Sequence, residues 1–178
     1  QRVGLARALA ADPEILLMDE PFSALDPLIR RQLQSEFIKL SRQLRKTTVF
    51  ITHDLDEAVK VGHRIAIMRD GQVIQVGTPE EIIMDPNDGY VADFVKGISR
   101  LGIVKAKSIM ISVQQYEQAH GPFPTDAVRA SEDTAIGMLI EKLVKTDGPI
   151  VIENDVHAAT GVVTQKVLLN SIAEHRDE

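Results

Sequence analysis

The spacing of apolar residues predicts alternating strands and helices in the first half of the chain. Residues 15–18 and 48–52 are short, nearly continuous apolar or β-branched runs, typical of strands buried on both faces of a parallel sheet. Between them, apolar side chains recur every three or four positions from Ile29 to Leu44, which predicts an amphipathic helix. A shorter helix is expected after His53. Alternating strands and helices predict an α/β layered domain.

Caps and turns extend this pattern to residue 95. Asp54, with Glu57 three positions later, predicts a capping box at the start of the helix after His53. Asp70-Gly71 between two apolar runs predicts a β-hairpin. Residues 78–81, Thr-Pro-Glu-Glu, predict a capped helix, and a last helix is expected over residues 90–95.

The chain changes character near residues 98–103, which we interpret as a linker between domains 1–97 and 104–178. In the second domain we expect, in order, a short apolar segment at 105–113, a strand near 127–128, a helix to residue 144 capped by Ser131, strands at 149–152 and 161–163, and a helix over 165–172. A unit of this size is small for an independent core, so we expect it to pack against a copy of itself or a companion.

Composition narrows the classes of function. The 178 residues carry a net charge of −6, which argues against a general nucleic-acid-binding role. The absence of cysteine excludes disulfides and thiolate metal sites. No apolar run approaches the roughly 20 residues of a membrane-spanning helix, so any membrane association is expected to come through a partner protein.

Acidic residues follow the first predicted strand, and a histidine follows the second. Asp19 and Glu20 end the run at 15–18, and His53 ends the run at 48–52. The carboxyl ends of parallel strands share one edge of the sheet, where open α/β sheets bind ligands. A carboxylate there can hold Mg²⁺, and a second can polarise an attacking water. For the Asp-Glu pair taken alone, a strand that ends in a solvated acidic turn remains the alternative.

The motifs occur in the order and spacing of ABC-transporter ATPases, which are P-loop NTPases. The resemblance rests on residues 1–9 (the helix after the signature motif), 16–21 (Walker B), 23–26 (D-loop), 52–54 (switch histidine) and 69–79 (the closing hairpin and the helix behind it). Domain 1–97 therefore resembles the C-terminal portion of an ABC ATPase domain.

The resemblance implies a role for each matching residue. Asp19 would support Mg²⁺ through water, and Glu20 would be the general base or water-polarising carboxylate. His53 would contact the γ-phosphate of ATP, and Asp26 would communicate across a head-to-tail dimer of two ATPase subunits. The dimer would drive transmembrane permease subunits at the cytoplasmic face of the cell membrane.

The chain also departs from the family pattern. It contains no G-x-x-x-x-G-K-S/T phosphate-binding loop, no glutamine loop and no Leu-Ser-Gly-Gly signature. It opens at Gln1 inside a segment with helix character and no preceding cap, so we expect further sequence upstream. The 178 residues alone are expected neither to bind ATP tightly nor to hydrolyse it.

Two regions narrow the resemblance. Residues 21–30, 50–58 and 64–68 are similar to ATPase subunits of glycine betaine/proline importers, which take up quaternary amine osmolytes with a solute-binding protein; polyamine and sulfonate importers share much of this pattern. Domain 104–178 resembles one CBS motif, which implies a regulatory adenine nucleotide. Val167 stands where an acidic residue usually contacts the ribose. A generic small α/β domain is the alternative for this region.

Two other functions stay open at this point. The chain can be a regulatory and dimerising fragment without catalysis, as the missing phosphate loop suggests. A soluble ABC ATPase of translation or DNA repair is the third possibility, although paired cassettes and coiled-coil insertions are absent from the 178 residues.

Overall fold

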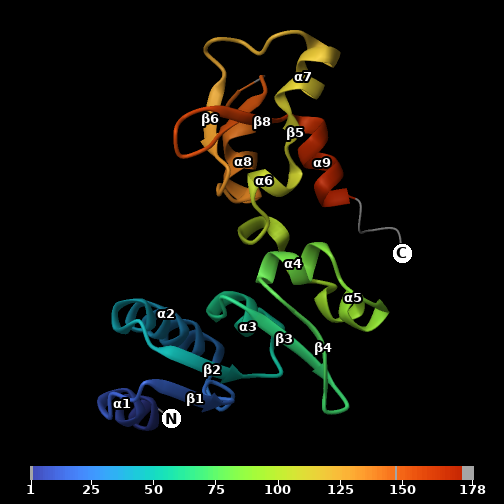
Figure 1. Cartoon of the computed structure of the whole chain (residues 1–178). Coiled ribbons are helices and arrows are strands. Elements are labelled where there is room, and N and C mark those ends of the chain that lie inside the picture. The colour runs from blue at the N-terminus through green and yellow to red at the C-terminus, as the bar shows by residue number, and fades with distance from the viewer. Residues whose placement is uncertain (1, 147, 174–178) are drawn as a thin grey trace. The chain divides into compact units, whose positions relative to one another are not determined.

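The computed structural model describes residues 2–146 and 148–173 and divides the chain into two compact units (Figure 1), Gln1–Ile98 and Ser99–Glu178. Gln1, which belongs to the first motif, and the end of the predicted second domain from residue 174 lie outside the described residues. In the described part of the chain, no helix combines the length and apolarity that crossing a bilayer requires.

Helices and strands alternate in the first half of the first unit. Its elements are α1 (Arg2–Ala10), β1 (Ile15–Asp19), α2 (Pro27–Leu44), β2 (Thr47–Ile51), α3 (Leu55–Val61), β3 (Ile65–Arg69), β4 (Gln72–Gly77), α4 (Pro79–Met84) and α5 (Gly89–Val95). Strands β1 and β2 are parallel, whereas β3 and β4 form an antiparallel hairpin. The predicted order of elements is confirmed.

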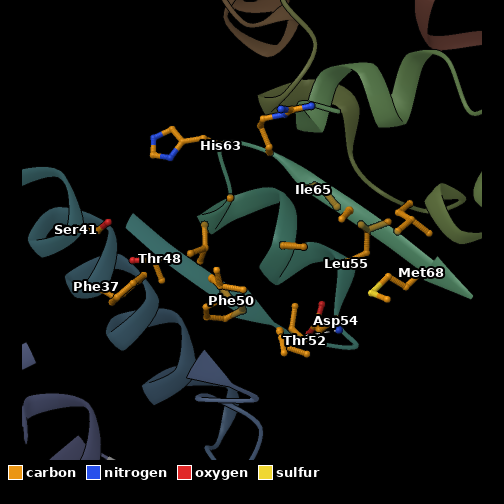
Figure 2. A pocket seen from close by; sticks show the side chains of 18 of the residues that line it. Phe37, Ser41, Thr48, Phe50, Thr52, Asp54, Leu55, His63, Ile65 and Met68 are labelled. Carbon is orange, nitrogen blue, oxygen red and sulfur yellow. Dashed lines mark hydrogen bonds between the residues drawn. The ribbon is translucent and has the colours of Figure 1, made fainter. Parts of the chain in front are cut away.

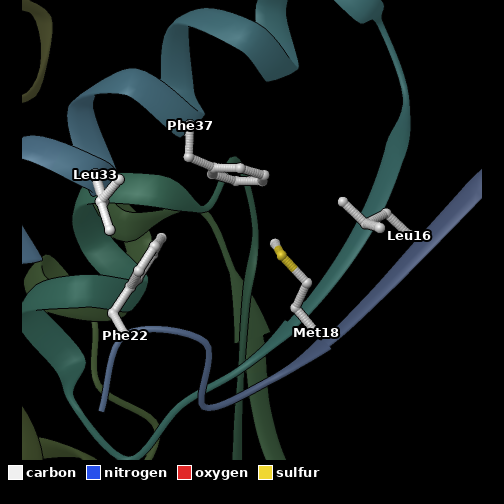
Figure 3. Packing of buried hydrophobic residues seen from close by; sticks show 5 residues of the cluster. All are labelled: Leu16, Met18, Phe22, Leu33 and Phe37. Atoms are coloured by element: carbon white, nitrogen blue, oxygen red, sulfur yellow. The ribbon is translucent and has the colours of Figure 1, made fainter. Parts of the chain in front are cut away.

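One face of the β1–β2 pair packs against α2 (Figure 3). The cluster consists of Leu16, Met18, Phe22, Leu33 and Phe37. The opposite face is open, because 57% of Ile15 and 74% of Leu17 are solvent-exposed and no described segment covers them. In β2, Val49 and Ile51 on the same face are 48% and 57% exposed. The prediction that both strands are buried on both faces is therefore wrong for the described chain.

The caps decide where helices begin. Thr78 and Glu81 form the predicted capping box of α4, and Asp70-Gly71 turns the β3–β4 hairpin with positive φ angles of 49° and 76°. At α3, Asp54 accepts a hydrogen bond from the Glu57 amide, but the Glu57 side chain does not return to the cap. It is buried and accepts hydrogen bonds from other side chains, so the predicted capping box is only half correct.

The second unit is built on a four-stranded sheet. Its elements are a 3₁₀ turn (Arg100–Gly102), α6 (Ala106–Ile109), β5 (Ile111–Ser112), α7 (Val113–His120), β6 (Val128–Ser131), α8 (Ile136–Leu143), β7 (Ile150–Glu153), β8 (Ala159–Val163) and α9 (Gln165–Ala173). The strand order is β5-β8-β7-β6, with β6 and β7 parallel and the other pairs antiparallel. Helix α8 and strand β7 contribute fully buried side chains, among them Leu139 and Ile150.

Two local predictions for this unit are corrected. Helix α7 was not expected, and it begins with a capping box between Ser112 and Gln115. Ser131 is not the cap of α8, because it is the last residue of β6 and its hydroxyl accepts from the Asp133 amide within the following turn. Helix α8 begins only after Ala135, which makes no side-chain cap.

Candidate functional site

Strands β1 and β2 end level with each other. Their parallel register pairs Asp19 with Ile51, and the Glu20 amide then donates to the Ile51 carbonyl at 3.0 Å. Because each strand ends here, the next residues of both segments leave the sheet at the same edge. This edge carries Asp19, Glu20 and His53, as the sequence predicts.

Glu20 and His53 form a direct pair. The His53 Nδ1 atom lies 2.6 Å from Glu20 Oε1, and the His53 backbone amide donates to the same oxygen at 2.8 Å. Glu20 has a φ of 47°, in the left-handed region that few non-glycine residues adopt. The His53 side chain is 80% exposed, so the ring is fixed on one side and open to solvent on the other.

The pair shifts the titration of both members. The hydrogen bond that His53 donates to Glu20, together with the negative charge of Glu20, raises the pKa of His53 above its ordinary value. The hydrogen bond from His53 lowers the pKa of Glu20. Near neutral pH the site therefore holds an ionised carboxylate next to a histidine that gains a proton more readily than a free imidazole does.

Asp19 and Asp26 lie in different surroundings. Asp19 ends β1 with an exposed side chain, and no contact of its carboxylate is recorded within the described residues. Asp26 caps α2: its Oδ1 accepts from the amides of Leu28 and Ile29, each at 3.1 Å. The described residues contain no cluster of three potential metal ligands. The structure thus brings Glu20 and His53 into contact but records no contact of Asp26 with them.

Sequence reasoning missed a polar cluster beside this pair. Arg30, Gln34, Thr52 and Glu57 come from α2, the end of β2 and α3, and they interact through their side chains. The only sequence signal for this cluster was Glu57, three residues after the cap Asp54. It predicted that the Glu57 side chain bonds the backbone of Asp54, whereas it bonds Gln34 and Thr52. Contacts across 23 residues of sequence, such as Gln34 with Glu57, need the fold to be seen.

A pocket of about 1080 Å³ adjoins the site (Figure 2). Residues of β2 and β3 line it, and these two strands are not paired with each other in the described chain. Thr52 and Asp54 lie at one end of α3 and His63 at the other, and all three line the pocket. His53 is also one of the residues that line this space.

Comparisons with known proteins show which proteins the chain is similar to. No protein-family model matches the chain. The fold is mixed α/β, and the homologues of the chain are ATP-binding subunits of ABC importers for betaine, choline or trimethylamine N-oxide.

Three relatives illustrate the similarity. The chain is 46% identical over 158 residues to the glycine betaine/proline betaine transport system ATP-binding protein of Salmonella typhimurium, covering 86% of this chain and 40% of that protein. It is 39% identical over 170 residues to the choline transport ATP-binding protein of Bacillus subtilis, covering 94% and 42%. It is 58% identical over 106 residues to a trimethylamine N-oxide transport system ATP-binding protein of Ruegeria pomeroyi, covering 60% and 31%.

The lengths of these matches show how much of the chain and of each relative is similar. The chain spans less than half the length of the curated relatives it matches. A match over 170 residues extends beyond the first unit, which ends at Ile98, so the choline transport relative resembles both units. Identity is higher in the shorter match than in the longer one.

Proposed function

We propose that this chain is the C-terminal part of an ATP-hydrolysing subunit that energises import of an osmolyte, such as the quaternary amine glycine betaine or the amino acid proline, in the service of osmoprotection. The contact between Glu20 and His53 at the level ends of β1 and β2 carries this proposal. The functions named for the relatives support the substrate class, since they include glycine betaine, choline and trimethylamine N-oxide transport.

In the proposed mechanism, Glu20 orients and polarises the attacking water. Its carboxylate is ionised and has a lowered pKa, which makes it a weak base. We therefore assign it electrostatic polarisation of the water rather than early removal of its proton. His53 holds Glu20 through Nδ1 and the backbone amide, which leaves Nε2 on the exposed side of the ring to contact the γ-phosphate.

The donor set fits ATP with Mg²⁺ in part. The exposed Asp19 carboxylate is the hard oxygen ligand that Mg²⁺ prefers, and Mg²⁺ bound beside phosphates uses only one or two carboxylates together with water. When bound, the ion supplies neutralisation of the phosphate charge. The phosphate-binding loop is absent from the 178 residues, so we assign the phosphate cradle to sequence outside them.

The proposed partners follow from this class. A second ATPase subunit would pack head to tail on the edge that carries the turn at Asp26. Permease subunits would hold the protein at the cytoplasmic face of the membrane, and a solute-binding protein would deliver the osmolyte indirectly. ATPase subunits of polyamine or sulfonate importers are the alternative within this class.

The second unit is proposed as one CBS-like regulatory domain. Its succession β6-α8-β7-β8-α9 supports this, because it reproduces the β-α-β-β-α order of the motif. A regulatory nucleotide is the proposed ligand class. Val167 offers no carboxylate for a ribose; its amide donates to the Thr164 hydroxyl at the start of α9. We therefore propose that recognition at this unit uses other contacts.

The experiment replaces Glu20 with Gln in a full-length subunit that carries these residues. ATP hydrolysis is expected to fall by at least about a hundredfold while ATP binding stays within about twofold. Glu14→Gln is the matched control, because this exposed carboxylate precedes β1 at the opposite end of the strand. Unchanged turnover in the Glu20 variant would remove Glu20 from the mechanism.

A second candidate is a regulatory and dimerising role without catalysis. The missing phosphate-binding loop favours it for the 178 residues taken alone. Both candidates place the phosphate cradle outside the 178 residues, and calorimetric titration of this chain with Mg²⁺-ATP tests that assignment. Submillimolar binding at the first unit would show that a cradle exists within the 178 residues, whereas its absence agrees with a cradle supplied from outside them.

A further inference from the structure

The segments that follow Glu20 and His53 are joined by a polar network that the proposed mechanism does not use. Arg30, the fourth residue of α2, donates through Nη2 to the carbonyls of Ser23 and Leu25 at 3.3 and 3.5 Å. These carbonyls belong to the turn directly after Glu20. Arg30 therefore holds the chain that leaves β1.

The same guanidinium reaches the start of α3. Its Nη1 lies 3.6 Å from Asp54 Oδ2, and its Nε lies 3.7 Å from Glu57 Oε1. The Nε atom is buried and has no hydrogen-bond partner within the described residues, so its contact with Glu57 is electrostatic. Arg30 thus links the turn after Glu20 with the helix that follows His53.

Glu57 is the centre of the network. Only 4% of this residue is exposed, and its two oxygens accept from Gln34 Nε2 and Thr52 Oγ1, each at 3.0 Å. A buried carboxylate is costly unless it is paired and hydrogen-bonded. Here the compensation comes from Gln34, Thr52 and Arg30, so all three side chains are held in one arrangement.

Thr52 passes this constraint to His53. It directly precedes His53, and its hydroxyl donates to Glu57 while accepting from the Asp54 amide at 3.0 Å. The residues on both sides of His53 are therefore fixed by a single hydroxyl group. The His53 amide and ring are therefore already oriented toward one oxygen of Glu20.

We propose that Arg30 and Glu57 are positioning residues that act through Thr52 to hold His53 against Glu20. The consequence for hydrolysis rests on the proposed function, whereas the geometric claim does not. Arg30 and Glu57 touch neither the proposed water nor the proposed phosphate. Their effect is on how firmly the Glu20–His53 contact is preorganised.

The test measures hydrogen exchange of the His53 amide by NMR in the 178-residue chain, without nucleotide. Thr52→Val removes the hydroxyl at nearly constant size, and Thr52→Ser keeps it. Exchange at His53 is expected to rise about tenfold in T52V, the size expected for one or two lost hydrogen bonds, and to stay within about twofold in T52S. Amides inside α2 should keep their protection in both variants.

Arg30→Lys and Glu57→Gln test the rest of the network. Lysine lacks the several N–H groups with which the guanidinium of Arg30 contacts its partners. Glutamine at position 57 replaces one carboxylate oxygen by an NH₂ group, which cannot accept a hydrogen bond from Gln34 or Thr52. Both should raise His53 exchange about as much as T52V. The matched controls are Arg31→Lys and Asp56→Asn, since each is the exposed neighbour of a network residue on the same helix.

Two results would overturn the proposal: His53 exchange unchanged in R30K and E57Q, or exchange raised by the same factor throughout the first unit. If T52V prevents folding, the contrast of R30K with R31K decides the question. In a full-length subunit, R30K should lower kcat for ATP about tenfold with KM nearly unchanged. A full-length protein without any ATPase activity would instead refute the proposed function and leave the exchange contrast intact.

Discussion

At the scale of single residues, the Glu20–His53 contact makes a prediction about pH. His53 has a raised pKa, so its contribution to stability is complete below about 6.5, its unfolded value, and is lost as pH rises through the raised pKa. Glu20 has a lowered pKa, so its contribution is present above about 4.3 and is lost as pH falls through that lowered pKa. Both contributions to stability are therefore fully present between about pH 4.3 and pH 6.5.

Replacing Glu20 with Gln should return the pKa of His53 toward its ordinary value, because both of the largest causes of the shift come from Glu20. An NMR titration of the His53 ring in the 178-residue chain measures this. Glu36→Gln is the control, since Glu36 lies on the exposed side of α2 and bonds Gln32 instead. An unchanged His53 titration in E20Q would mean that the two side chains do not meet in solution.

At the scale of elements, Asp26 has a structural role that is separate from its proposed role between subunits. Its carboxylate caps α2, the helix that covers the buried face of β1 and β2. Asp26→Ala should lower the free energy of unfolding by about 1 kcal/mol, and Asp26→Asn by less, because asparagine is also a good cap. Urea denaturation of the chain checks this. Equal stability of D26A and the unmodified chain would contradict the capping assignment.

Strong local signals made most elements predictable from the sequence. The Asp70-Gly71 turn and the Thr78–Glu81 capping box need only neighbouring residues, and both formed as predicted. Helix α7 carried a readable signal as well, since Ser112 and Gln115 have capping-box spacing, although only Val113, Tyr116 and Ala119 are apolar in its eight residues. The direction of the Glu57 side chain was not readable, because it depends on Gln34 and Thr52 in the folded chain.

Some features of the candidate site were also predictable from the sequence, and others were not. The pairing of Glu20 with His53 was predictable, because parallel strands of equal length bring their ends together. The exposure of Ile15 and Leu17 was not, because an apolar run predicts burial without saying which segment provides the cover. Arg30 and its network were missed for the same reason as Glu57.

At the scale of the whole molecule, each unit is held by its own contacts. In the second unit, a Cβ atom at Gly161 would lie 2.9 Å from the Ile111 carbonyl oxygen and would meet Met110 Sδ. Gly161→Ala should therefore destabilise the β5–β8 pairing by about 1–3 kcal/mol. Residue-resolved hydrogen exchange should show the loss in residues 99–173 and leave the amide of His53 unchanged.

Gly102→Ala is the control for this variant, because a Cβ atom there meets nothing within 4 Å. Equal loss of protection in both units of G161A would show that they fold as one cooperative body. Loss confined to the second unit would agree with the division at Ile98 and Ser99. It would also allow the regulation proposed for the second unit to be tested separately from the chemistry proposed for the first.

The most direct measurement follows the ¹⁵N signals of the His53 ring in a full-length subunit with Mg²⁺ and either a non-hydrolysable ATP analogue or ADP. His63, at the other end of α3, is the internal control. If the edge formed by Glu20 and His53 receives the terminal phosphate, the His53 signals shift with the ATP analogue and not with ADP. The His63 signals should be the same with both nucleotides. Equal responses of His53 to both nucleotides, or none to either, would contradict the proposed site.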